Sequence, residues 1–239
     1  MRYLDLTLPL PAENLALDEA LLDQAEQSAE PQEILRVWEP GQVMVVVGRS
    51  SRLEEEVDLA ACRAAAVPVL RRASGGAAIV TGPGCLMYGL ILSCQRQPAL
   101  RAVDLAHQFV LQRMVAALER RVPHVRCQGI SDLALEQRKF SGNSMRCKRE
   151  HLLYHGTLLY DFPLDLVGRF LRQPPRQPEY RAGRDHGAFL TNLPLDATTL
   201  RQALAAAWQA DRPYADWPQA ETARLALQRY SQADWNQRL

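Results

Sequence analysis

Lysine is almost absent from this sequence of 239 residues. Of its 28 basic residues, only Lys139 and Lys148 are lysine and the other 26 are arginine. A lysine supplies a compact ammonium that approaches one oxygen as a point charge and can lose its proton, which a guanidinium does not. Because both lysines fall within one ten-residue stretch, that stretch is a candidate for chemistry. The alternative is two ordinary surface lysines.

Further absences exclude whole classes of protein. No apolar run approaches the roughly 20 residues that span a bilayer, and Asp5 interrupts the apolar region that a signal peptide would need. The net charge of +1 gives no electrostatic basis for binding nucleic acid. The five cysteines form no C-x-x-C pair, which argues against a zinc site and a disulfide framework. We therefore expect a soluble, cytoplasmic protein that binds neither nucleic acid nor membranes and holds no metal.

The pattern of apolar residues predicts an α+β fold. The length suits one large domain or two small ones, and because no linker divides the chain we expect a single domain over residues 1–239. Strands with helices between and after them favour α+β over a strictly alternating β-α-β arrangement. The predicted helices cover 10–27, 54–66, 103–121, 164–171, 198–208 and 220–230, and the predicted strands cover 34–38, 43–48, 67–70, 86–93, 132–135 and 155–160. The first two strands, separated by Pro40-Gly41, are expected to pair with each other.

An arginine- and glycine-rich segment, Arg71-Arg72-Ala73-Ser74-Gly75-Gly76, lies between two predicted strands. Glycine lets the backbone approach a ligand closely, free N–H groups can cradle a phosphate, and guanidinium groups bind anions in a bidentate manner. The segment is not a P-loop, because it lacks Gly-Lys-Ser/Thr. It is either an anion-binding loop or a tight glycine turn with solvated arginines.

The second candidate segment surrounds Lys139. Alternating polarity over Asp132–Ser144 predicts a strand that presents the Lys139 ammonium to one face, and Ser141–Asn143 is expected to turn the chain before the strand at His155. The alternative is a hairpin lysine that faces water.

Together these segments resemble the lipoate–protein ligase and octanoyltransferase family, which is related to the biotin ligases. The resemblance runs in order along nearly the whole chain. The matching segments are Asn14–Leu22, Leu35–Trp38, Val46–Arg49, Arg71–Gly76, Arg138–Asn143, His155–Leu159, Thr191–Leu193, Arg229–Ser231 and Asp234–Asn236.

The resemblance implies a single biotin/lipoate-ligase-like catalytic domain with mixed or antiparallel sheets flanked by helices. Its implied reaction attaches a lipoyl or octanoyl group to a lysine of a lipoyl-carrier domain through an acyl-AMP intermediate. Lys139 would be the catalytic residue that stabilises the negative charge developing during attack on the carbonyl. The implied substrate- and adenylate-binding residues are Arg71, Arg72, Ser74, Gly75, Gly76, Ala77, Ser141, Gly142, His155 and Gly156.

The same resemblance implies the small molecules and partners. A ligase would use ATP and Mg²⁺ with lipoate or octanoate as the substrate, and it would hold no tightly bound cofactor. The partners would be lipoyl-carrier domains, either dehydrogenase E2 subunits or the glycine-cleavage H protein.

Two departures from the family pattern lie in and after the loop. Ala77 stands where a third glycine or an arginine is usual, and Thr81 stands where a histidine is common. The sequence also ends where two-domain ligases continue, so we expect no C-terminal accessory domain. The protein would then use a separate accessory subunit or would not adenylate.

These departures keep other hypotheses open. The first is an ATP-independent octanoyl or lipoyl transferase that forms a thioester on Cys127, 12 residues before Lys139, with nearby cations activating the thiol. The alternative for Cys127 is a buried small apolar residue. A biotin ligase is a weaker hypothesis, because its Gly-Arg-Gly-rich loop is absent. From another class comes a non-catalytic module that binds an acyl group or a carrier protein.

Overall fold

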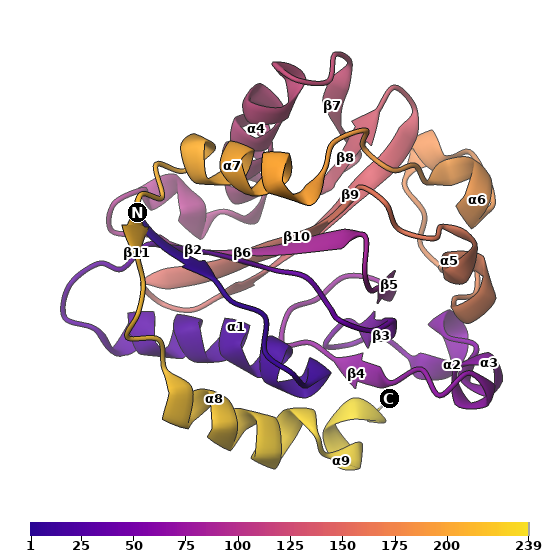
Figure 1. The fold of residues 1–239 in the computed structure, drawn as a ribbon, viewed down its shortest axis with the longest axis horizontal. Coiled ribbons are helices and arrows are strands. Elements are labelled where there is room, and N and C mark those ends of the chain that lie inside the picture. Colours follow the sequence, from indigo (N-terminus) through magenta and orange to yellow (C-terminus); the bar gives the residue numbers. More distant parts are fainter. Residues whose placement is uncertain (239) are drawn as a thin grey trace.

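The computed structural model describes residues 1–238, and its core is an eight-stranded mixed sheet with a smaller sheet beside it (Figure 1). The large sheet has the order β11-β1-β2-β6-β10-β9-β8-β7. In that order the strands are Arg212–Pro213, Arg2–Asp5, Ile34–Trp38, Cys85–Ser93, His151–Leu159, Arg138–Cys147, Asp132–Leu135 and Val125–Gln128. The small sheet has the order β4-β3-β5, with strands Val69–Arg71, Met44–Val47 and Ile79–Thr81.

The centre of the large sheet is the antiparallel pair β6 and β10. All nine residues of β6 are buried, as expected for a strand that has neighbours on both edges and packing on both faces. Because β6 and β10 pair over nine positions, from His151↔Ser93 to Leu159↔Cys85, the register of β10 is fixed along its whole length. β9 continues the sheet beyond β10, with His155 opposite Ser144 and Gly156 opposite Asn143.

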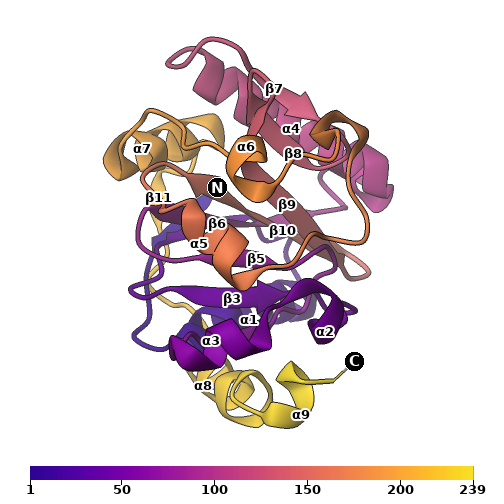
Figure 2. The same cartoon turned by 90° about the vertical axis from the view of Figure 1, so that its right-hand side faces the viewer.

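Helices cover both faces of the large sheet. In Figure 1, α1 (Pro11–Gln27) and α8 (Gln219–Leu225) lie on one face, and α4 (Val103–Glu119) and α7 (Ala197–Ala207) lie on the other. Figure 2 shows that the small sheet lies on the same side as α1. We call this side the α1 face and the opposite side the α4 face.

The remaining helices are short. They are α2 (Leu53–Glu56), α3 (Leu59–Ala64), α5 (Asp165–Phe170), α6 (His186–Phe189) and α9 (Ala233–Asn236), and a π-helical turn over Ala226–Tyr230 continues α8. Aspartate side chains at the N-caps of α3, α6 and α7 accept backbone N–H groups that the first helical turn leaves free. No helix within residues 1–238 has the length and apolar character needed to cross a bilayer.

The α+β prediction is confirmed, but three local expectations were wrong. The strands at 34–38 and 43–48 do not pair, because β2 pairs with β1 and β6 in the large sheet while β3 pairs with β4 and β5 in the small one. Ser141–Asn143 does not turn the chain, since β9 runs unbroken from Arg138 to Cys147. The helix expected at 54–66 is two helices, interrupted at Val57 by a bridge to Leu171.

Candidate active site

The arginine/glycine loop, residues 72–78, connects β4 and β5 and faces β9 and β10 on the α1 face. Its carbonyl groups are tied down. The Ser74 carbonyl accepts the Arg49 N–H at 2.8 Å, the Gly75 carbonyl accepts the Ser144 hydroxyl at 2.9 Å, and the Gly76 carbonyl accepts the Ser51 hydroxyl at 3.2 Å. The loop is therefore held from three directions before any ligand arrives.

Three consecutive amide groups of the same loop remain free, whereas the N–H groups of Arg72 and Ala78 donate to the Val47 carbonyl and the Glu56 carboxylate. Gly75, Gly76 and Ala77 are exposed, and no acceptor for their N–H groups lies within residues 1–238. Successive backbone N–H groups that have no acceptor can bind an anion together. We call residues 75–77 the amide cradle, and it is the part of the loop that can take a carboxylate or phosphate.

Arg71 and Arg72 both point away from solvent and bind main-chain carbonyl groups. Arg71 is fully buried, and its guanidinium donates to the carbonyls of Gly48 and Ser51 at 2.8 Å each. It also donates to the carbonyls of the C-terminal segment, Trp235, Asn236 and Arg238. Arg71 therefore ties the C-terminal segment to the turn after β3.

Arg72 closes the arginine/glycine loop from inside. Its guanidinium donates to the carbonyls of Val46, Gly75 and Ala77, at 3.2, 2.5 and 3.0 Å, and its Nε donates to the Ser74 hydroxyl at 3.1 Å. Burial lowers the pKa of Arg72 to about 10. The left-handed Gly76 (φ 87°) makes this closure possible, because a Cβ there would stand 2.8 Å from an Arg72 nitrogen.

Lys139 lies on β9, on the α1 face, and its ammonium is already paired. Its Nζ is 2.7 Å from Oδ1 of Asp132 on β8, and the Tyr180 hydroxyl donates to Oδ2 of the same carboxylate at 2.8 Å. The Lys139 side chain is 26% exposed, so the ammonium is reachable from solvent. Gly142 lies next to it, since a Cβ at Gly142 would stand 2.8 Å from Nζ.

The strand register places Lys139 and the amide cradle on one face. Gly142 and Ser144 are two positions apart on β9 and therefore point to the same side. Gly142 contacts Lys139, and the Ser144 hydroxyl binds the carbonyl of Gly75. The ammonium and the free amide groups are thus at the two ends of one short stretch of β9.

His155 and Gly156, adjacent on β10, have different roles. The His155 imidazole is 2.6 Å from the Ser74 hydroxyl and so lies directly under the arginine/glycine loop. Gly156 faces the other way and leaves room for Asn143, whose side-chain oxygen would be 1.8 Å from a Cβ at position 156. That Asn143 oxygen accepts the Tyr88 hydroxyl at 2.5 Å, and its Nδ2 donates to the Ser131 carbonyl at 2.7 Å.

Seven of the ten predicted binding residues belong to the arginine/glycine loop, contact it or lie next to Lys139; they are Arg72, Ser74, Gly75, Gly76, Ala77, Gly142 and His155. Arg71, Ser141 and Gly156 point elsewhere. Ser141 is 1% exposed and points to the α4 face, where its hydroxyl is 3.2 Å from the Asn143 side-chain nitrogen. Asp132, Tyr180 and Ser144 contact the site and were not among the predicted binding residues. The sequence gives no signal for Tyr180, which reaches Asp132 from 48 positions along the chain.

Cys127 lies on the face opposite Lys139. It pairs with Leu133, which belongs to the core under α4, whereas the neighbouring Asp132 points to the α1 face and binds Lys139. Adjacent residues of a strand point to opposite faces, and directly paired residues share one. Cys127 is exposed, so the expectation of a buried small apolar residue was wrong. Desolvation nevertheless raises the pKa of its thiol, so neither its position nor its environment activates it as a nucleophile beside Lys139.

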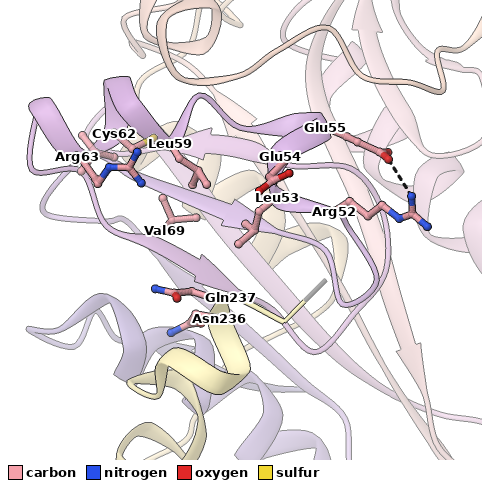
Figure 3. Close-up of a pocket in the computed structure, with 11 residues that line it drawn as sticks. Arg52, Leu53, Glu54, Glu55, Leu59, Cys62, Arg63, Val69, Asn236 and Gln237 are labelled. Atoms are coloured by element: carbon pink, nitrogen blue, oxygen red, sulfur yellow. Dashed lines mark hydrogen bonds and ion pairs between the residues drawn. The ribbon is translucent and has the colours of Figure 1, made fainter.

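A cavity of about 630 Å³ lies beyond the small sheet, away from these groups (Figure 3). It opens between α2, α3 and the C-terminal segment. The residues that line it are Arg52, Leu53, Glu54, Glu55, Leu59, Cys62, Arg63, Val67, Val69, Asn236 and Gln237. None of the predicted site residues lines this cavity.

Sequence comparisons agree on one family. The family model described as the lipoyl protein ligase A/B catalytic domain matches residues 10–206. A Mycoplasma pneumoniae protein named "Probable lipoate-protein ligase A" is 29% identical over 173 residues, which is 72% of this chain and 49% of the relative. The octanoyltransferase LipM of Geobacillus kaustophilus is 26% identical over 209 residues, which is 77% of this chain and 74% of the relative. The chain spans about half the length of the first of these relatives.

Solved structures show the same fold. A bi-partite lipoate protein ligase from Thermoplasma acidophilum, studied with its E2 lipoyl domain, superposes with a TM-score of 0.79 at 21% identity over 99% of this chain and 95% of the other. A lipoate-protein ligase A with bound ATP superposes with a TM-score of 0.83 at 21% identity over 99% and 98%. This likeness establishes the fold of residues 1–238.

Proposed function

Because the chain belongs to the lipoyl protein ligase A/B catalytic domain family, we propose that it attaches a lipoyl or octanoyl group to a lysine of a lipoyl-carrier domain through an acyl-AMP. The observation that carries the proposal is the amide cradle on the same face as the Lys139 ammonium. One binds an anion through N–H groups and the other supplies a compact positive charge. Acyl transfer needs N–H donors and a positive charge at the position where negative charge develops.

In the first step, a carboxylate oxygen of lipoate or octanoate attacks the α-phosphorus of ATP, and pyrophosphate leaves. In the second, the carrier-lysine amine attacks the acyl carbonyl, and the new N–C bond forms. The C–O bond to the phosphate of AMP breaks, AMP leaves with the electron pair, and the amine releases one proton to solvent. Lys139 stabilises the negative charge on the α-phosphate oxygens in the first step and on the carbonyl oxygen in the second. A Mg²⁺ ion would be held mainly by the phosphate oxygens, since no cluster of three or more acidic, histidine or cysteine side chains suited to a metal occurs within residues 1–238.

The proposed partners and small molecules follow the relatives. An archaeal bi-partite ligase was studied with its E2 lipoyl domain, and another ligase of this fold binds ATP. We propose the same classes here: ATP, lipoate or octanoate, and the lipoyl domain of an E2 subunit or an H protein as the acceptor. The proposal includes a single catalytic domain over residues 1–239, a cytoplasmic location, and a separate accessory subunit where adenylation requires one.

The main rival is an ATP-independent octanoyl transferase, which a LipM relative at 26% identity supports. Its thioester would not form on Cys127, because that thiol lies on the α4 face while Lys139 lies on the α1 face. The structure therefore favours the adenylate mechanism over a Cys127 thioester. The amide cradle and the Lys139 ammonium, which lie on the same face, argue against a non-catalytic module.

Intact-mass spectrometry of an apo lipoyl domain separates these proposals. One reaction contains lipoate and Mg-ATP, and another contains an octanoyl-loaded acyl carrier without ATP. A lipoyl mass gain only in the first supports the ligase, and an octanoyl gain only in the second supports the transferase. No gain in either, with a verified carrier and added accessory subunit, would contradict both enzymes.

Lys139→Ala tests the residue that carries the charge, and Lys148→Ala is its matched control. Lys148 is 27% exposed and pairs with Asp23 at 2.6 Å, whereas Lys139 is 26% exposed and pairs with Asp132 at 2.7 Å. Removal of one transition-state donor costs about 100-fold to 1000-fold in rate. We expect that loss for Lys139→Ala and less than a threefold change for Lys148→Ala; equal effects would refute the role of Lys139.

A further inference from the structure

A buried chain of polar groups runs beneath the arginine/glycine loop and ends on it. Arg36 on β2 binds Oδ1 of Asp18 on α1 at 2.6 Å, and the other carboxylate oxygen of Asp18 is 3.2 Å from Nδ1 of His155 on β10. Nε2 of the same imidazole is 2.6 Å from the Ser74 hydroxyl. The chain therefore joins α1, β2 and β10 to the residue that immediately precedes the amide cradle.

The charge on Asp18 sets the direction of every hydrogen bond in this chain. Burial alone would raise the pKa of Asp18, but the Arg36 guanidinium and the hydrogen bond from His155 outweigh it and hold that pKa below its usual value. An ionised carboxylate only accepts hydrogen bonds, so His155 donates through Nδ1. Because the Ser74 hydroxyl accepts the Nε–H of Arg72, its own hydrogen is available to Nε2 of His155, which we assign as the acceptor.

Ser74 transmits this arrangement to the cradle. Its hydroxyl receives the Nε–H of Arg72 at 3.1 Å while it donates to His155, and its carbonyl receives the Arg49 N–H. Ser74 is 1% exposed. Its side chain and carbonyl are both fixed, which leaves the following peptide groups little freedom to turn their N–H groups away from a ligand.

We propose that Asp18 and His155 are positioning residues that act through Ser74 to hold the amide cradle in its anion-binding orientation. This inference rests on the proposed function, because it assumes that the cradle binds the acyl carboxylate or the phosphate of the acyl-adenylate. A site held in place by buried supporting hydrogen bonds loses less entropy when a ligand binds. The interaction with His155 therefore acts on substrate affinity more than on the rate of the bound complex.

Two substitutions of His155 cut the chain on different sides. The amide nitrogen of Asn occupies the place of imidazole Nδ1, so His155→Asn keeps a donor to Asp18 and loses contact with Ser74. The amide of Gln extends to the place of Nε2, so His155→Gln keeps contact with Ser74 and loses Asp18. Ser74→Ala removes the hydroxyl that contacts His155, with little change in side-chain volume. It tests the same contact independently if a histidine variant fails to fold.

The expected result is an increase in the KM for lipoate and Mg-ATP with little change in kcat. Leaving one buried polar group unsatisfied costs about 1.4 kcal/mol, which is tenfold in affinity. We expect His155→Asn and Ser74→Ala each to raise KM about tenfold and to change kcat less than threefold. His155→Gln should raise KM by about threefold, because its amide still contacts Ser74 but is no longer oriented by Asp18. The double variant His155→Asn/Ser74→Ala should match either single variant, because both break the same link.

His107 on α4 provides the matched control. It is a buried histidine whose Nδ1 is 2.9 Å from the Tyr154 hydroxyl on the α4 face, with no connection to the cradle. His107→Asn should leave KM within threefold of the wild type. An equal increase in KM for His107→Asn, or a double variant whose effect is the product of the two single effects, would refute the positioning role.

A second measurement does not depend on turnover. In the ¹⁵N spectrum of the unliganded wild-type protein, the His155 imidazole should carry its proton on Nδ1 near neutral pH. A proton on Nε2 would overturn the assigned chain even if the enzyme is active. Conversely, a wild-type protein that shows the Nδ1 proton but never acylates a carrier would refute the proposed function and leave the hydrogen-bonded chain intact.

Discussion

Replacing Gly156 with alanine should destabilise the protein strongly, although the change adds a single methyl group. A Cβ at this position would stand 1.8 Å from the Asn143 side-chain oxygen and 2.9 Å from the Gly142 carbonyl. Both distances are below any that real Cβ atoms adopt. Because the second obstacle is backbone in the middle of β9, the strand cannot yield, and the Asn143 side chain must move.

The cost can be worked out from what Asn143 holds. Its side chain accepts the Tyr88 hydroxyl at 2.5 Å and donates to the Ser131 carbonyl at 2.7 Å, and Tyr88 is 1% exposed. A buried polar group left without a partner costs about 1–3 kcal/mol, so the loss of two partners amounts to about 3 kcal/mol. For a chain of this size, that lowers Tm by roughly 6–12 °C.

Thermal unfolding followed by circular dichroism checks the prediction, with Gly168→Ala as the control. Gly168 is exposed inside α5, and nothing lies within 4 Å of a Cβ placed there. Alanine in a helix interior is favoured over glycine by about 0.5–1 kcal/mol, so Gly168→Ala should raise Tm slightly. A Gly156→Ala protein whose Tm lies within 2 °C of the wild type would show that the packing of Asn143 against β10 is wrong.

Three further predictions concern single side chains. Cys127→Ser should retain acylation activity within twofold of the wild type in the intact-mass assay; a loss above tenfold would restore the thioester hypothesis. Glu19→Gln should lower the free energy of unfolding by about 3 kcal/mol in urea titrations, because the 1% exposed Glu19 carboxylate holds Arg146, Arg229 and Tyr230 at 2.6–2.7 Å; a loss below 1 kcal/mol would contradict that clamp. Burial lowers the pKa of His107 from 6.5, so its contribution to stability is present above about pH 6.5 and is lost as pH falls below it; a wild-type Tm that falls no faster between pH 7.5 and 5.5 than that of His107→Gln would contradict this.

The sequence predicted elements with strong periodicity better than their partners in space. The helix at 103–121 corresponds to α4 (Val103–Glu119), and the strand at 86–93 lies within β6. The predicted pairing of 34–38 with 43–48 was wrong, because β2 pairs with β6 in the large sheet and β3 pairs with β5 in the small sheet, and both strands are fully buried there. Short connecting segments do not determine pairing when each strand has a better partner far along the chain.

The candidate site was predicted in part. Lys139 and the glycine loop were identified because lysine is rare and glycine is needed for close backbone approach. Asp18 and Tyr180 were missed as functional residues, because each acts through a contact with a residue more than 40 positions away. Such contacts depend on sheet register and loop packing, which no local pattern of residues encodes.

The geometry around Nζ explains why position 139 holds a lysine in a chain that otherwise uses almost only arginine as its basic residue. Lys139 places its ammonium 2.7 Å from Asp132 and so close to Gly142 that a Cβ there would be 2.8 Å away. A compact point charge fits this space, whereas the planar fork of an arginine needs room for several donors in one plane. Lys148 also pairs with an aspartate, yet it lies at the far end of β9, after the strand ends at Cys147. Composition therefore singles out both lysines, and only the one that shares a strand face with free backbone amide groups is placed for acyl chemistry.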